Sequence, residues 1–317
     1  MVHARAFSFT DDSASVIYPS ASGVSNPSAL GNILAGPKTM DTALTLFQLR
    51  YIQSSWYQEL FQSSRDPLPN ASHYVWQMCH DMREWFDSLP DTLPGAFRDL
   101  FELELLYSYV YCLAPSCRVL TVSAYGKTLI FEYSITYMQK MYQITKDPQN
   151  KAFYTYHDAL RVYFVGSQFN AVLTESQDQL LNRIIPFEQL IPGSPPPPPL
   201  PPSSGGANNI DRSITCIVQI KEILRTYGER WDDSNALLSS FESQAQPVLS
   251  SLYHRKNPFD GLSPQNSPPA FLSQSSFDTV SNYGSHGWQH LSPPFSGNDG
   301  GQENVNRSRS PYGPQIG

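Results

Sequence analysis

The sequence has little cysteine and no long hydrophobic run. Only four of its 317 residues are cysteine, and no two of them form a Cys-x-x-Cys pair. The first residues lack the continuous apolar core of a secretory signal, and the most apolar stretch, residues 103–114, is interrupted by Glu104 and Ser108. A bilayer span needs about 20 mostly apolar residues. We therefore expect a protein of a reducing compartment, without a disulfide framework and without a membrane anchor.

Charge is scarce as well. Charged residues make up 15% of the chain, whereas about a quarter is usual. The 21 Lys and Arg residues against 28 Asp and Glu residues give a net charge of −7. Duplex DNA binding depends on clustered Lys and Arg that neutralise phosphates. We therefore expect no direct DNA contact by this chain.

Helical patterns dominate residues 40–256. Apolar residues recur there at steps of three and four, in segments that proline interrupts. These patterns predict helices over about residues 41–65, 70–89, 94–114, 123–146, 152–181, 210–228 and 231–252. No Val, Ile and Thr alternation is long enough to demand a strand. The sequence therefore predicts an all-α fold.

Four residues are expected to shape helix ends. Asp41 and Ser123 are suited to the N-cap position, and Gly228 to the position just after a helix. Pro247 is expected to kink or split the last helix.

Three segments lack any helical period. Residues 1–39 are expected to be a flexible N-terminal segment, and residues 257–317 a disordered tail rich in Ser, Pro, Gly and Asn. Residues 194–208 begin with Ser194 and five prolines, which predicts an extended and then flexible proline-rich linker. Ser-Pro pairs are candidate sites of proline-directed phosphorylation, although a Ser/Pro-rich composition also produces them by chance; they lie at Ser194, Ser263, Ser267, Ser292 and Ser310.

Motifs that bind nucleotides or metals are incomplete. Gly126-Lys127-Thr128 is similar to the end of a phosphate-binding loop, but Thr121 stands where that motif needs glycine. The cysteines, including Cys79 beside His80, lack the paired spacing of a zinc site, so we expect buried thiols. We predict no cofactor and no metal.

Catalytic arrangements are also missing. His80-Asp81 and His157-Asp158 are adjacent pairs, and Glu102 and Glu104 are two residues apart; on a helix, neither spacing brings the side chains together. There is no Gly-x-Ser-x-Gly motif. We predict no catalytic residues and a protein that is not an enzyme. Tyrosines are frequent between residues 107 and 163, and we expect them to pack in the core rather than line a ligand pocket.

Five segments together resemble a known family. They are residues 41–50 (DTALTLFQLR), 55–63 (SWYQELFQS), 76–85 (WQMCHDMREW), 101–117 (FELELLYSYVYCLAPSC) and 153–161 (FYTYHDALR). They resemble the fungal-specific transcription factor domain, the middle homology region of binuclear zinc-cluster regulators. The resemblance covers about residues 40–190 and is expected to extend to Tyr253.

This resemblance implies an all-helical regulatory domain that lies between a DNA-binding zinc cluster and an activation region. Residues 1–39 contain no cysteine, so the six-cysteine cluster is not among them. The resemblance implies a nuclear transcription regulator whose partners are other regulators or coactivators. In this family the regulated genes are often those of metabolic or secondary-metabolite pathways. One alternative stays open: a helical adaptor without DNA contact, which pairs with a full-length regulator or presents its proline run to another protein.

Overall fold

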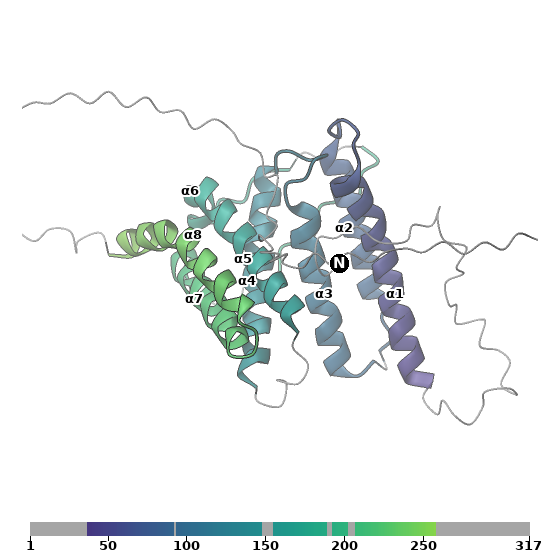
Figure 1. Ribbon diagram of the computed structural model, residues 1–317. Coiled ribbons are helices and arrows are strands. Elements are labelled where there is room, and N and C mark those ends of the chain that lie inside the picture. The colour runs from purple at the N-terminus through teal and green to yellow at the C-terminus, as the bar shows by residue number, and fades with distance from the viewer. Residues whose placement is uncertain (1–36, 92, 148–154, 189–191, 202–206, 258–317) are drawn as a thin grey trace, which may run out of the picture. The chain divides into compact units, whose positions relative to one another are not determined.

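A computed structural model describes residues 37–91, 93–147, 155–188, 192–201 and 207–257, with their side chains from residue 44 onward. All regular structure in these residues is helical (Figure 1). The elements are α1 (Pro37–Tyr57), the π-helical turn η2 (Gln58–Gln62), α2 (Ala71–Asp87), α3 (Gly95–Leu113), α4 (Ala124–Lys146), α5 (Tyr156–Glu175), α6 (Gln177–Leu181), α7 (Asn209–Gly228) and α8 (Asp233–Lys256). The predicted all-α fold is confirmed.

Helix α3 is the central element. It packs against α1, α2, α4 and α5, and every residue from Leu103 to Leu113 is buried. A helix that is apolar on all sides has to be enclosed by others. The apolar run at residues 103–114 is therefore a buried core helix. No helix in the described ranges is both long enough and apolar enough to cross a bilayer.

Helices α7 and α8 complete the domain on the side away from α1 (Figure 1). They pack against each other, and α5 contacts both of them. Helix α4 connects α3 to the group formed by α5, α7 and α8, because it packs against α3, α5 and α7. Residues far apart in the sequence therefore share one continuous apolar core.

Aromatic side chains fill much of this core. The Tyr111 and Phe164 rings stack with centroids 4.6 Å apart, and the Phe61 ring meets Tyr111 edge-on at 5.0 Å. Tyr109 and Tyr133 lie 4.9 Å apart. Such pairs add about 0.5–1.5 kcal/mol each beyond their area burial. The prediction that the tyrosines are core residues is confirmed for those that are buried, which are Tyr107, Tyr109, Tyr111, Tyr133 and Tyr137.

Local capping sets two helix starts. The Ser123 hydroxyl accepts a hydrogen bond from the Gly126 amide (3.0 Å), which confirms the predicted N-cap of α4. Thr155 and Asp158 form a reciprocal capping box, so α5 begins at Tyr156 rather than near residue 152.

The long helix predicted over residues 152–181 is wrong in a second way. Ser176 leaves the helical conformation at φ −134° and ψ 36°, so α5 ends at Glu175 and the short α6 follows. The apolar period continues across this break, which is why the sequence pattern did not reveal it.

Other helix ends differ from the prediction. Helix α1 begins at Pro37, not at Asp41, because proline has a favourable φ for the first helical turn and needs no amide partner there. Gly228 is the last residue of α7, not the residue after it. A Cβ atom at Gly228 would lie 2.1 Å from Asn235 Oδ1, so this glycine permits close approach of α8.

Pro247 lies inside α8, which continues to Lys256. Of the two predicted outcomes the split is therefore wrong, whereas the kink agrees with Figure 1, in which the C-terminal part of α8 turns away from its first turns. The predicted flexible segment 1–39 is wrong for residues 37–39, which belong to α1. Residues 1–36, residues 258–317 of the predicted tail 257–317, and residues 202–206 of the predicted linker lie outside the described residues.

Candidate functional site

The histidines and cysteines singled out in the sequence do not assemble into a metal cluster within the described residues. Cys79 and Cys112 are buried and neighbour each other across α2 and α3. Burial, together with the Cys112 thiol, raises the pKa of Cys79 well above its usual value. A thiol that stays protonated is a poor nucleophile and a poor metal ligand. Cys117 is exposed, and its thiol donates to the Leu60 carbonyl (3.0 Å).

The incomplete phosphate-loop motif forms the first turns of α4. Lys127 Nζ pairs with Glu175 at 2.9 Å. The Thr128 hydroxyl donates to the Ala124 carbonyl of the same helix (3.2 Å). Thr128 therefore makes a contact within α4, and Lys127 joins α4 to the end of α5.

The candidate acid–base pairs point in different directions, as their spacing predicts. His80 pairs with Glu84 at 3.3 Å, whereas Asp81 accepts a hydrogen bond from Gln77 at 2.8 Å. Asp158 belongs to the capping box of α5.

Glu102 binds Lys140 at 3.0 Å on the outside of α3, and Glu104 points into the core.

Glu104 is the centre of a buried charge cluster that sequence reasoning missed. Its Oε2 accepts from Arg50 Nη1 at 2.8 Å, and its Oε1 accepts from Arg161 Nη1 at 2.7 Å. Gln53 accepts from the same Arg50 nitrogen (2.6 Å) and donates to Ser108 Oγ (2.6 Å). We call Arg50, Glu104 and Arg161 the Glu104 brace, because they join α1, α3 and α5.

The electrostatics of the Glu104 brace are strong. Burial by itself would raise the pKa of Glu104, but attraction to Arg161 and Arg50 and their hydrogen bonds lower it from 4.5 to about 2. The Arg161 guanidinium also lies over the Tyr107 ring, 4.9 Å from its centroid. Both carboxylate oxygens of Glu104 accept hydrogen bonds, so the cluster fixes α1, α3 and α5 relative to one another.

A second buried pair joins α4 and α7. Arg212 binds Glu132 in a two-pronged geometry, with Nη1–Oε1 at 2.9 Å and Nη2–Oε2 at 2.5 Å. Arg212 Nη1 also donates to Asn209 Oδ1 (2.7 Å), and Asn209 donates to the Leu180 carbonyl (2.6 Å). This network therefore links α4, α6 and α7.

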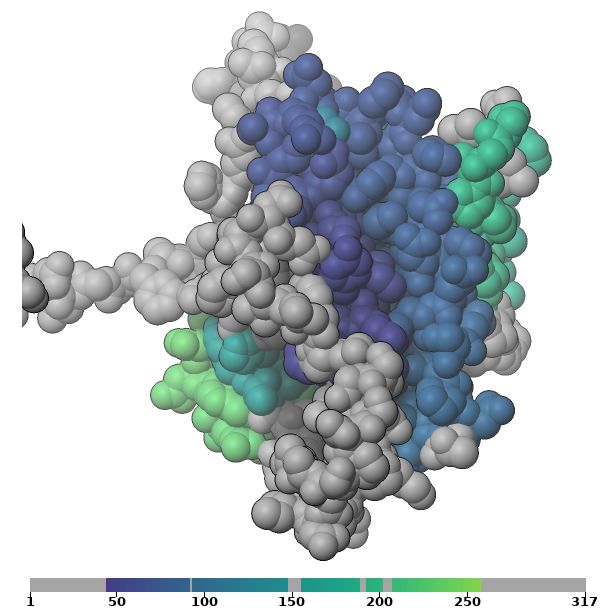
Figure 2. All heavy atoms as spheres, turned by 90° about the vertical axis from the view of Figure 1, so that its right-hand side faces the viewer, coloured from purple at the N-terminus to yellow at the C-terminus, as the bar shows by residue number. Residues whose placement is uncertain are grey.

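Residues 194–201, which we call the proline strand, lie against the helical domain. Immediately before them, Pro192 and Gly193 form a turn in which Gly193 has a φ of +82°, a conformation that glycine adopts without strain. The turn leads to Ser194, whose hydroxyl hydrogen-bonds to Nδ1 of His73 in the first turn of α2. Figure 2 shows the strand in teal-green along the blue surface that includes α2.

Two tyrosines of α4 bind the backbone of the proline strand. The Tyr125 hydroxyl donates to the Pro198 carbonyl (3.2 Å), and the Tyr133 hydroxyl donates to the Pro199 carbonyl (2.6 Å). Burial raises the pKa of both hydroxyls, which keeps them protonated as donors. The Trp76 ring of α2 packs edge-on against the Tyr125 ring, with the two ring centroids 6.3 Å apart.

The sequence predicts an extended proline run with a flexible end, but it does not predict that residues 194–201 contact the helical domain. Proline carbonyls are good acceptors, and the hydroxyls that bind them come from a helix more than 60 residues earlier in the chain. Composition alone does not reveal such a partner. We call His73, Trp76, Tyr125 and Tyr133 the proline seat.

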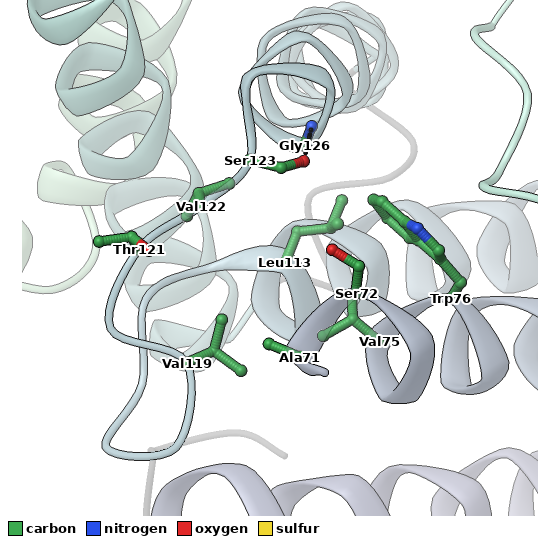
Figure 3. Close-up of a pocket in the computed structure, with 10 residues that line it drawn as sticks. All are labelled: Ala71, Ser72, Val75, Trp76, Leu113, Val119, Thr121, Val122, Ser123 and Gly126. Carbon is green, nitrogen blue, oxygen red and sulfur yellow. Dashed lines mark hydrogen bonds between the residues drawn. The ribbon is translucent and has the colours of Figure 1, made fainter. Parts of the chain in front are cut away.

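A small pocket adjoins the proline seat (Figure 3). Ser72 and Trp76 of α2 face Leu113, the loop residue Val119 and the start of α4 around it. Its volume is about 30 Å³. That is room for about one water, whereas small-molecule sites usually measure about 300–1,000 Å³. The pocket is therefore too small for a metabolite.

The chain matches no protein-family model, no curated protein and no solved structure.

Proposed function

We propose that this chain is the helical regulatory portion of a transcription regulator of the fungal zinc-cluster type. We further propose that it acts in the nucleus through other regulators or coactivators, and that it makes no direct DNA contact. Its net charge of −7 supports the last point.

The observation that carries this proposal is where the three residues of the Glu104 brace lie in the sequence. Arg50, Glu104 and Arg161 come from three different segments among the five that resemble the family: residues 41–50, 101–117 and 153–161. Three of the five resembling segments are therefore joined by one buried cluster. A buried cluster that fixes three helices suits a domain that acts through its shape rather than through a reactive group.

A reporter experiment tests the proposal. The full chain is fused to an unrelated DNA-binding domain and directed to a promoter that drives a reporter. We expect the fusion to change reporter output relative to the DNA-binding domain alone. A matched fusion tests whether residues 257–317 activate the reporter or act only as an inert spacer. In it, four aromatic residues of this tail are changed to Ala: Phe271, Phe277, Trp288 and Phe295.

Equal output from the full-chain fusion and from the DNA-binding domain alone would contradict the proposal. The expression level and nuclear accumulation of each fusion are measured alongside, so that equal output is compared at equal dose.

One observation favours the alternative function, a helical adaptor. The proline strand is held in an ordered position, so a proline-rich recognition element is part of the folded domain. An adaptor would recruit partners without changing reporter output. Co-purification of a stable partner with a chain that is silent in the reporter experiment would favour this second function.

A further inference from the structure

The contacts between the proline strand and the proline seat have the chemistry of polyproline recognition. A run of prolines favours the polyproline II conformation, which has three residues per turn and leaves its carbonyls free. Proteins that recognise it supply aromatic side chains for the proline rings and donors for the carbonyls. The proline seat supplies the donors, since the Tyr125 and Tyr133 hydroxyls bind the Pro198 and Pro199 carbonyls, and three of its four residues are aromatic.

The burial pattern of the strand follows the same period. Pro198 is buried, and Pro195 and Pro201, three residues to either side, are half-buried. Pro196 and Pro199 are also three residues apart, and both are exposed. Pro197 and Leu200 are half-buried as well, so two ridges of a three-residue helix contact the domain and the third, with Pro196 and Pro199, faces solvent.

The contacts involve proline rings, backbone carbonyls and one apolar side chain, Leu200, which packs against the hydrophobic core. Of the described contacts, the two hydroxyls bind main-chain carbonyls, and the position that is buried is a proline. Only the link from Ser194 to His73 uses a side chain of the strand for hydrogen bonding. A different peptide with prolines at the same three-residue spacing would satisfy the same donors.

We propose that the proline seat is a recognition site for polyproline II peptides, which the chain's own proline strand occupies, and that a proline-rich segment of a partner protein binds there when this strand is released. The inference stands independently of the proposed role in transcription, because it rests on the strand and its seat alone.

The tethered strand competes with any partner. A covalently linked segment acts at an effective concentration on the order of 1 mM. If the strand itself binds its seat with an intrinsic dissociation constant of about 100 µM, it weakens the apparent binding of any competing peptide about tenfold. Release of the strand is therefore the step that would make the seat available.

A peptide-binding experiment on the full chain tests this inference. The strand is removed from its seat by P195G, P196S, P197G, P198S and P199G in one variant. The probe is a fluorescein-labelled peptide with the sequence of residues 192–201, and binding is followed by fluorescence anisotropy. We expect the variant to bind the peptide at least about tenfold more tightly than the wild-type chain does. A peptide with every proline changed to alanine should not bind.

Hydroxyl-deletion variants provide the specificity control. Y125F and Y133F, added to the opened variant, should reduce peptide affinity at least about tenfold, because two hydrogen bonds are lost. Y163F is the matched control, since the Tyr163 hydroxyl bonds to Ser240 and Gln244 away from the seat. It should leave peptide affinity unchanged.

Circular dichroism establishes that each variant is folded. If the five-site variant unfolds, P198G replaces it, because that change removes only the buried ring of the strand. A folded opened variant that fails to bind the peptide would overturn the inference. Binding that is unchanged by Y125F and Y133F, or that is equal for the alanine peptide, would overturn it as well.

Discussion

Replacing Glu104 with glutamine tests the strongest buried interaction in the domain. E104Q keeps the size of the side chain but removes its charge, so Arg161 (11% exposed) and the half-buried Arg50 (26% exposed) lose the carboxylate between them. The folded protein lowers the pKa of Glu104 from 4.5 to about 2. At about 1.36 kcal/mol for each pH unit between the folded and unfolded pKa values, this lowering corresponds to about 3 kcal/mol.

An independent magnitude agrees. Removing one partner of a buried ion pair typically costs about 3–5 kcal/mol, and a whole domain is stable by about 5–15 kcal/mol. We therefore expect E104Q to lower the free energy of unfolding by at least about 3 kcal/mol, measured by urea denaturation with circular dichroism.

The control lies two residues away on the same helix. Glu102 pairs with Lys140 on the surface, and their side chains are 34% and 29% exposed. An exposed pair contributes under about 1 kcal/mol, so E102Q should change stability only slightly. Equal effects of E104Q and E102Q, or a loss below about 1 kcal/mol for E104Q, would refute the reasoning.

The same residue predicts a pH dependence. The folded pKa of Glu104 lies below the unfolded value, so the protein gains stability from this group when it is ionised in both states, above about pH 4.5. That contribution is lost as the pH falls from 4.5 toward 2. The difference in unfolding free energy between wild type and E104Q should therefore shrink over this range. A difference that stays constant with pH would contradict the assigned cause.

Three further predictions concern other parts of the chain. R212M should destabilise the domain by about 3 kcal/mol or more in urea denaturation, because it leaves Glu132 buried without its partner. The double variant R212M/E132M should recover most of this loss. A double variant as unstable as the single one would argue against this pairing. Y133F should cost about 1 kcal/mol and increase cleavage by a proline-specific endoprotease at the Pro199–Leu200 bond, because the Pro199 carbonyl loses its donor. An unchanged cleavage rate would show that the hydroxyl does not hold the strand. The purified chain should form no specific complex with duplex DNA in a mobility-shift assay at moderate salt, given its net charge of −7; a sharp complex that survives excess competitor would contradict this.

The helices were largely predictable because their apolar residues repeat at helical spacing. Helix α3 shows this most clearly, since its apolar run leads directly to a buried central position. Helix ends were predictable where the cap is local, as at Ser123. They were wrong where the cause was not visible in the apolar pattern, as at Ser176, or where it was a tertiary neighbour, as with Asn235 beside Gly228.

The buried charges and the proline strand were not predictable for a common reason. The local sequence does not distinguish the buried Glu104 from the surface residue Glu102 two positions earlier. The partners of Glu104, Arg50 and Arg161, lie more than 50 residues away. The proline run indicates an extended conformation but not what it lies against. In both cases the decisive partner is distant in the sequence, and a period or a composition carries no information about such a pairing.

The measurement that tests the central claim most directly is promoter occupancy in cells. The full chain is tagged and crosslinked with a protein–protein crosslinker before formaldehyde, and the DNA recovered with it is sequenced. The proposed function predicts enrichment at a discrete set of promoters, together with no binding of the purified chain to those same DNA fragments. Recovery equal to that from untagged cells would contradict the claim that this helical domain regulates transcription through its partners.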